Sequence, residues 1–274
     1  MEIIRKILII SMLLVFAHAS MFLDQGIGVS GKQLGGANTA SPEGAAAVYW
    51  NMAAFSGQNG EIYFDYASSF LEINKYTFLY GASEEGDSLI LGAYRVDAGQ
   101  VIALVTSNVV PVNVNYADTV VFAGYAFKLA PETSLGLTYK LIQQNFTDVK
   151  NSSALDISYY SKIDQNLQFG LVAENAYVDK SEDKPIIRAG VKYSVGKLGL
   201  AVDTKYDTAL SGLYWSTGAS FRVIRGFYLK AGYSSYDEKI FLGTSLDANA
   251  YKVDYVYFDS DLGATHQIGM TFNL

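Results

Sequence analysis

The sequence of 274 residues contains no cysteine and only two histidines, His18 and His266. Without cysteine the chain can form no disulfide, no thiol nucleophile and no cysteine-bound metal site. His18 lies in an N-terminal segment that we expect to be removed, and His266 falls on the apolar face of the last predicted strand. A serine–histidine nucleophile needs an accessible histidine and an orienting acid. We therefore expect no enzyme activity, no metal site and no other cofactor.

Charge is also scarce. Charged residues make up 17% of the chain, against about 25% in ordinary soluble domains. The net charge of -7 removes the electrostatic basis for binding nucleic acid. No segment beyond the N-terminal region has 18 consecutive apolar residues, which disfavours a membrane protein built from helices. Tyrosine and glycine are abundant and proline is rare, a balance that favours strands over a helical bundle.

The N-terminus has the three parts of a secretory signal peptide. Arg5 and Lys6 form a basic region, an apolar stretch follows over residues 7–16, and Ala17 and Ala19 form an A-x-A cleavage site. The apolar stretch is too short to span a bilayer as a helix. We therefore predict a signal peptide over residues 1–19 and a mature chain that begins at Ser20.

Much of the remaining chain alternates apolar and polar residues with a period of two, which indicates β-strands. In one segment the apolar set is Leu135, Leu137, Tyr139 and Leu141, and the polar set is Ser134, Gly136, Thr138 and Lys140. Similar segments cover residues 155–161, 167–174, 187–195, 198–203 and 227–234, whereas residues 108–116 and 178–184 are the longest gaps without alternation. The polar faces are dominated by small uncharged residues, as in a crowded lumen, and the apolar faces end in aromatic residues. We predict an all-β fold, a transmembrane antiparallel β-barrel in the outer membrane of a diderm bacterium, rather than a secreted sandwich.

Single charges interrupt the predicted inward faces. Two interpretations remain open: the charges pair across the lumen and fill it, because buried charges need partners, or they line a polar conduit. The inward charges are Lys140, Asp156, Glu174, Arg188, Lys192, Asp203, Lys205, Arg222, Lys230, Lys252 and Asp254.

The last predicted strand runs to the final residue and carries Ile268, Met270, Phe272 and Leu274 on its apolar face. This pattern resembles the C-terminal signal that the bacterial barrel-assembly machinery recognises, although that signal commonly ends in phenylalanine. We therefore expect the assembly machinery and outer-membrane lipid to be partners of the chain.

One segment, residues 28–55, does not alternate and is rich in glycine and alanine. Gly35 and Gly36 permit positive φ and close backbone packing. Ser41 and Pro42 read as a helix start, with Ser41 as the N-cap residue, followed by a short helical turn over residues 45–48. We predict that residues 20–58 form a plug inside the barrel and that residues 59–274 form the barrel.

The plug also carries the candidate ligand-path residues. Tyr49 and Trp50 are amphipathic and can either contact an apolar ligand or anchor the plug to the barrel wall. We favour the anchor for Trp50, and we interpret Asn51 as a hydrogen-bonding residue of the turn. The candidate plug and ligand-path residues are Gly35, Gly36, Tyr49, Trp50, Asn51 and Met52.

Two motifs within this segment carry a resemblance to a known family. Leu34-Gly35-Gly36-Ala37 and Val48-Tyr49-Trp50-Asn51-Met52-Ala53 resemble the N-terminal signature of the FadL-type outer-membrane transporters of hydrophobic compounds and of their PorV/PorQ relatives. Met52 stands where that family usually has proline. Residues 261–266 are similar to the closing segment of the PorV/PorQ branch. The resemblance implies a monomeric barrel of about fourteen strands with the N-terminal segment in its lumen, and about 215 residues at about 15 per strand agree with that number.

Two functions follow from the resemblance. The first is transport of hydrophobic small molecules, such as long-chain fatty acids, across the outer membrane. The second is a PorV/PorQ-like role in a protein secretion system, with secretion-system proteins as partners. Most gaps between the predicted strands are short, which favours transport over the handling of protein cargo.

Overall fold

A computed structural model describes residues 26–68, 73–104, 111–145, 149–178, 185–260 and 263–274. The predicted signal peptide, residues 1–19, lies outside this part of the chain, and so do residues 261–262 of the closing segment. Among the described residues, no helix is long and apolar enough to cross a membrane.

The chain forms a closed antiparallel barrel of fourteen strands, as the alternation and the resemblance predict. Each strand pairs with its neighbours in sequence, and β1 closes the barrel by pairing with β14, from Glu61 opposite Asn273 to Ser68 opposite His266. A closed barrel leaves no unpaired strand edge, so its backbone groups are satisfied within the wall. The strands are β1 Glu61–Ser68, β2 Asn74–Glu84, β3 Asp87–Leu104, β4 Pro111–Ala130, β5 Thr133–Asn145, β6 Val149–Lys162, β7 Leu167–Val178, β8 Ile186–Val195, β9 Leu198–Asp207, β10 Gly212–Ile224, β11 Phe227–Ser234, β12 Lys239–Asp247, β13 Tyr251–Ser260 and β14 Gly263–Asn273.

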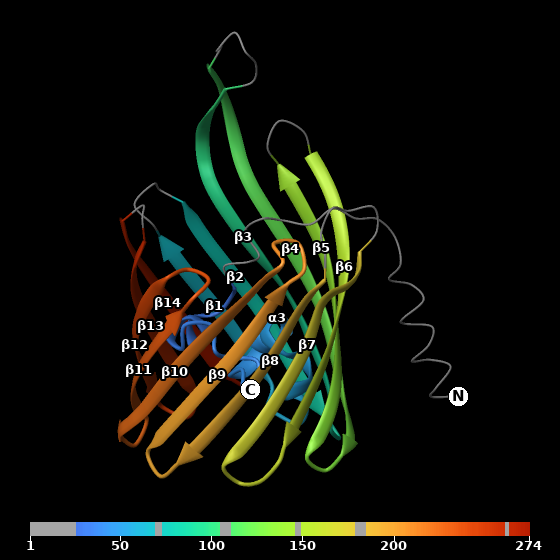
Figure 1. Ribbon diagram of the computed structural model, residues 1–274, viewed down its shortest axis with the longest axis vertical. Helices are drawn as coiled ribbons and strands as arrows, with labels where there is room; N and C mark the ends of the chain where they lie inside the picture. Colours follow the sequence, from blue (N-terminus) through green and yellow to red (C-terminus); the bar gives the residue numbers. More distant parts are fainter. Residues whose placement is uncertain (1–25, 69–72, 105–110, 146–148, 179–184, 261–262) are drawn as a thin grey trace, which may run out of the picture.

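The wall is uneven in height. β3 and β4 have 18 and 20 residues, whereas β11 and β12 have 8 and 9. In Figure 1 the longer strands rise on one side above the rest of the barrel. The predicted gap over residues 108–116 is wrong in part, because β4 begins at Pro111. Residues 112–115 alternate valine with asparagine, a short pattern that indicates the strand.

Strand faces follow the alternation. In β8, Val191, Tyr193 and Val195 are exposed on the outside, whereas Arg188 and Gly190 are buried on the inside. In β14 the apolar set of the predicted assembly signal, Ile268, Met270 and Phe272 in the strand and Leu274 after it, is exposed on the outer side, and Thr265, Gln267 and Thr271 are buried on the inner side. The apolar outer surface is what a barrel needs to face lipid.

The N-terminal segment lies inside the barrel, where Figure 1 shows it in blue. We call residues 26–58 the plug. It contains four short helical turns: α2 Val29–Gln33, η2 Gly44–Ala46, α3 Ala47–Trp50 and η3 Met52–Phe55. Nearly all of their residues are buried, because the plug packs its apolar side chains against the inner face of the wall.

Ser41 is not a helix cap, contrary to the prediction. The first helical residue is Gly44, and no side chain of the plug caps this turn. The carboxylate of Glu61 in β1 instead accepts the backbone N–H of Ala45. Ser41 accepts a hydrogen bond of 2.9 Å from Lys192 of β8. The barrel wall therefore satisfies polar groups that a helix in isolation would satisfy locally.

Candidate functional site

The first turn of the plug is locked into the wall by glycine. Gly35 and Gly36 adopt φ values of 65° and 87°, which side chains rarely tolerate, and they end α2 by donating to the carbonyls of Lys32 and Gly31. This turn lies directly against β11. A Cβ atom at Gly232 would overlap the backbone of Leu34 and Gly35. Plug and wall thus meet here backbone to backbone.

This contact gives a test of plug docking. Gly232→Val should displace the turn at Gly35, because the overlap involves backbone that cannot rotate away; overpacking of this kind costs about 1–3 kcal/mol. We expect faster cleavage of the plug by protease in the folded barrel. Ala231→Val, one residue away on the outer face, is the matched control and should leave cleavage unchanged. Equal cleavage of both variants would contradict the docking described here.

Asn51 ties two parts of the plug to the wall. Its side-chain amide donates to the carbonyl of Thr39 at 2.8 Å and to the carbonyl of Tyr159 in β6 at 3.0 Å. Its neighbour Met52 is buried and packs beside Gly124 of β4. The Asn51 amide thus acts as a structural hydrogen-bond donor, and Met52 fills the space between plug and wall.

Tyr49 and Trp50 pack edge to face with ring centroids 5.0 Å apart. The indole N–H of Trp50 donates to the carbonyl of Ile27 at 2.8 Å, so Trp50 fastens the start of the plug to α3. Arg188 of β8 donates to the carbonyl of Tyr49 at 2.9 Å, and its guanidinium lies 4.9 Å from the Tyr49 ring and 5.4 Å from the Trp50 ring. A cation over two aromatic faces is a favourable contact when water is excluded. Both aromatic residues also border a small cavity of about 60 Å³.

Arg188 belongs to a buried set of four charges that we call the wall network. The Arg188 guanidinium lies 3.1 Å from the Glu174 carboxylate. The Lys140 ammonium lies 2.8 Å from the carboxylate of Asp156 and 3.5 Å from that of Glu174. The four side chains are 1–6% exposed. The network occupies a bulge at which the pairing of β6 with β7 shifts register and Asn175 takes a φ of 54°.

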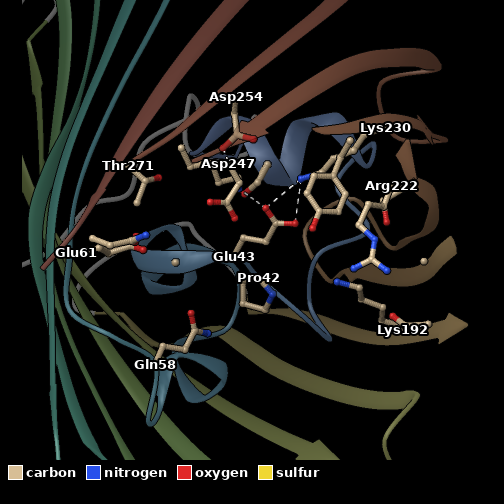
Figure 2. A pocket seen from close by; sticks show the side chains of 18 of the residues that line it. Pro42, Glu43, Gln58, Glu61, Lys192, Arg222, Lys230, Asp247, Asp254 and Thr271 are labelled. Atoms are coloured by element: carbon tan, nitrogen blue, oxygen red, sulfur yellow. Dashed lines mark hydrogen bonds and ion pairs between the residues drawn. The ribbon is translucent and has the colours of Figure 1, made fainter. Parts of the chain in front are cut away.

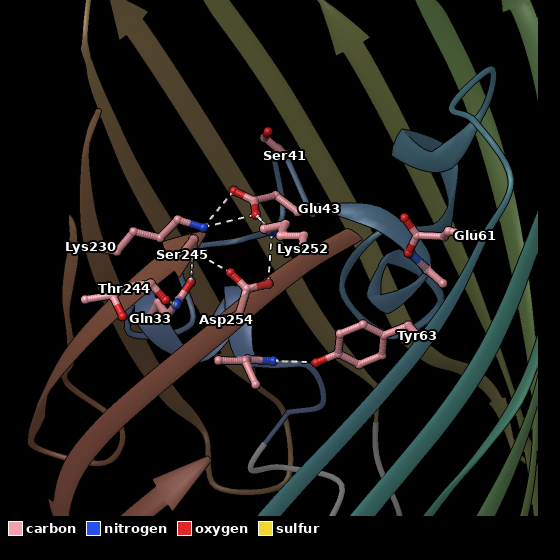
Figure 3. A network of polar contacts seen from close by, with 12 residues as sticks. Gln33, Ser41, Glu43, Glu61, Tyr63, Lys230, Thr244, Ser245, Lys252 and Asp254 are labelled. Carbon is pink, nitrogen blue, oxygen red and sulfur yellow. Dashed lines mark hydrogen bonds and ion pairs between the residues drawn. The ribbon is translucent and has the colours of Figure 1, made fainter. Parts of the chain in front are cut away.

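A second ionic contact holds the other side of the plug, and we call it the Glu43 latch. Glu43 lies 3.0 Å from Lys230 of β11 and also pairs with Lys252 of β13, which lies 3.0 Å from Asp254 (Figure 3). Burial alone would raise the pKa of the Glu43 carboxyl, but Lys230, Lys252 and Lys192 outweigh it and hold that pKa well below its usual range. The latch therefore stabilises the docked plug at pH values above the ordinary pKa of a glutamate. This contribution to stability is lost as the pH falls through the lowered pKa of Glu43.

The inner surface of the barrel is divided. Over β2–β5 it is largely apolar, although buried polar residues such as Asp118 and Lys140 also lie there, and its apolar residues pack in one cluster with plug residues such as Val48, Met52 and Phe55. Over β5–β8 and β11–β13 it carries the charges of the wall network and of the Glu43 latch. We call the barrel residues of this apolar cluster on β2–β5 the apolar wall: Leu79, Ile90, Tyr94, Val96, Val120, Phe122, Ala126 and Ile142.

The structure thus gathers all six candidate plug residues at the contact between plug and wall. It places Ile268, Met270, Phe272 and Leu274 elsewhere, on the outer surface. Sequence reasoning missed the roles of Glu43 and of the apolar wall. The alternation of Ile90, Gly92 and Tyr94 with Leu89, Leu91 and Ala93 gives no polar face, and this lack was the available signal for a strand that is apolar on both faces.

No protein-family model and no curated protein matches the chain. Solved structures do match it in fold. The toluene transporter TodX of Pseudomonas putida superposes with a TM-score of 0.64 at 12% identity, covering 90% of this chain and 96% of its own. The monoaromatic hydrocarbon channel CymD gives 0.64 at 10% identity, covering 93% and 99%. A FadL homologue of Pseudomonas aeruginosa gives 0.61 at 9% identity, covering 94% and 100%. The chain therefore has the fold of the FadL-type barrels over nearly its whole length.

Proposed function

We propose that this protein transports hydrophobic small molecules across the outer membrane, long-chain fatty acids among them. The observation that carries the proposal is the apolar wall. The lumen of a water-filled porin is polar, whereas here a cluster of buried apolar side chains extends from Leu79 in β2 to Ile142 in β5 and packs against the plug. An apolar molecule that moves between plug and wall on this side would replace plug contacts with contacts to the same apolar side chains, which favours it over a polar solute.

The fold supports the same proposal. Two barrels of the same fold are described as a toluene transporter and as a monoaromatic hydrocarbon channel. The apolar outer surface and the predicted signal peptide support a place in the outer membrane. The ion pairs of the wall network support the interpretation that inward charges fill the lumen and do not line a conduit. No feature of the described residues favours the alternative role in protein secretion.

The experiment compares two changes at one position of the apolar wall. Phe122→Gln places a polar amide on this surface and should reduce uptake of toluene and of a long-chain fatty acid in cells that lack their own transporter. Phe122→Leu keeps the surface apolar and should retain most uptake. Heat-modifiable gel mobility checks that both variants fold. If a folded Phe122→Gln variant takes up both compounds as fast as Phe122→Leu, the apolar wall is not the path.

A further inference from the structure

A cavity of about 490 Å³ lies beside the plug at the end of the barrel where β1 begins and β14 ends. Its lining includes Glu43 of the plug, Glu61 of β1 and Asn273 of β14. Its size is within the range of small-molecule sites. It is separate from the apolar wall, because none of the apolar-wall residues borders it.

Five cations border this cavity, and three of them form no ion pair with an acid among the described residues. Lys230 and Lys252 pair with Glu43, and Lys197 donates to the carbonyl of Val223 at 3.2 Å. The Lys192 ammonium donates to the Ser41 hydroxyl, and the Arg222 guanidinium makes no hydrogen bond or ion pair, as far as the described residues show. Figure 2 shows the side chains of Lys192 and Arg222 facing the cavity, from β8 and β10.

Glu43 acts electrostatically on Lys192 but is shared with Lys230 and Lys252, and the other acids that border the cavity are engaged elsewhere. Asp254 is engaged by Lys252, Glu61 accepts the N–H of Ala45, and Asp247 accepts the N–H of Asn249 at 2.9 Å. Lys192 and Arg222, two cations that border one cavity without an ion pair of their own, attract an anion. The Glu43 latch shows which anion suits the site, since a carboxylate already lies between Lys230 and Lys252 (Figure 3).

We propose that this cavity binds a carboxylate ligand through Lys192 and Arg222, and that the ligand competes with Glu43 for Lys230 and Lys252 and so releases the plug. In the absence of ligand, Glu43 is a tethered occupant of the cationic site. A carboxylate that arrives from solution provides the lysines with a replacement partner, so opening the latch leaves no buried charge unpaired. The ligand is either a small free carboxylate or the headgroup of an apolar chain.

Plug release can be followed with a single thiol, because the chain has no cysteine of its own. Ser30→Cys places the thiol on α2, where the residue borders the cavity and is 5% exposed. Acetate, octanoate and octanol are added to the purified barrel at constant ionic strength, and the rate of reaction with a charged thiol reagent is measured. Acceleration by octanoate, but not by octanol or chloride, supports the proposal. An equal effect of acetate identifies a free small carboxylate, and an effect of octanoate alone identifies the headgroup of an apolar chain.

Two variants separate competition from simple damage. Glu43→Gln removes the tethered competitor, so it should raise the basal labelling rate and also tighten carboxylate binding, measured calorimetrically, by about tenfold if Glu43 holds the site nine-tenths of the time. A purely structural Glu43 would give faster labelling with unchanged or weaker binding. Arg222→Gln, at a side chain that makes no hydrogen bond or ion pair with the described residues of the plug, should weaken the carboxylate effect and leave basal labelling as it was.

Failure of this proposal is distinct from failure of the transport function. If neither carboxylate accelerates labelling beyond chloride, or if Glu43→Gln binds carboxylate no more tightly, the competing site does not exist, whatever the result of the toluene uptake measurement. If carboxylate binding and release are observed while toluene uptake fails, the site stands and the transport proposal falls.

Discussion

Deletion of residues 28–55 should produce a barrel that still folds and that leaks small solutes. The fourteen strands pair only with one another, and β1 closes against β14 without any backbone contribution from the plug to this pairing. Closed strands satisfy their own backbone hydrogen bonds, so the wall does not need the plug to form. The charges that lose plug partners, Lys230 and Lys252 among them, become accessible to water, which removes the penalty of an unpaired buried charge.

The leak is expected to be large because the plug fills the barrel. Its residues Val48, Trp50, Met52 and Phe55 are almost fully buried against the wall. Removing them exchanges a packed interior for open lumen, and selectivity for apolar compounds should fall together with the rise in general permeability. Liposome swelling with sugars of increasing size measures the first effect, and fatty-acid uptake measures the second.

The outer-face variant Ala231→Val is the control for nonspecific changes in the barrel, and heat-modifiable mobility shows whether each protein is folded. In the same experiment, the variant Trp50→Ala tests whether Trp50 anchors the plug or lines the ligand path. If Trp50 only fastens the plug through Ile27, leak should rise and selectivity should fall. If it lines the ligand path, uptake of apolar compounds should fall without leak. A deletion that leaves both permeabilities unchanged would show that residues 28–55 do not gate the lumen.

Local patterns made the barrel predictable. Alternation such as that of Val191, Tyr193 and Val195 with Arg188 and Gly190 depends only on the two-residue period of a strand, so it assigns faces without knowledge of the partners. The paired glycines at Gly35 and Gly36 likewise mark a turn by their own conformational freedom.

Long-range contacts were not predictable from the sequence. Glu43 meets Lys230 and Lys252 across 187 and 209 positions of chain, and the carbonyl of Tyr49 meets Arg188 across 139. The prediction of Ser41 as a helix cap was wrong for the same reason, because the backbone N–H of Ala45 donates to the Glu61 side chain on a barrel strand. In the plug, local rules are overridden wherever the wall offers a better partner.

The second large effect is expected in the wall network. Lys140→Met should destabilise the protein by about 3–5 kcal/mol, because it leaves buried carboxylates without their cation. Lys140 contacts both Asp156 and Glu174, and it also donates to the side chain of Asn175 at 2.8 Å. Glu174 retains Arg188, so Asp156 bears most of the loss. Urea unfolding in lipid vesicles, followed by tryptophan fluorescence, measures the change in the free energy of unfolding.

A double change tests whether the charge is the cause. Asp156→Asn removes the carboxylate that Lys140→Met leaves alone, and the amide oxygen can still accept the N–H of Asn175, which the carboxylate accepts at 2.7 Å. The double variant should therefore be more stable than Lys140→Met alone, an interaction that independent sites would not show. Lys197→Met, at an exposed position in the turn after β8, is the control and should change stability by no more than about 0.5 kcal/mol. If the double variant is less stable than the single one, lost packing and not the unpaired charge accounts for the effect, and the wall network does not hold the barrel through its ion pairs.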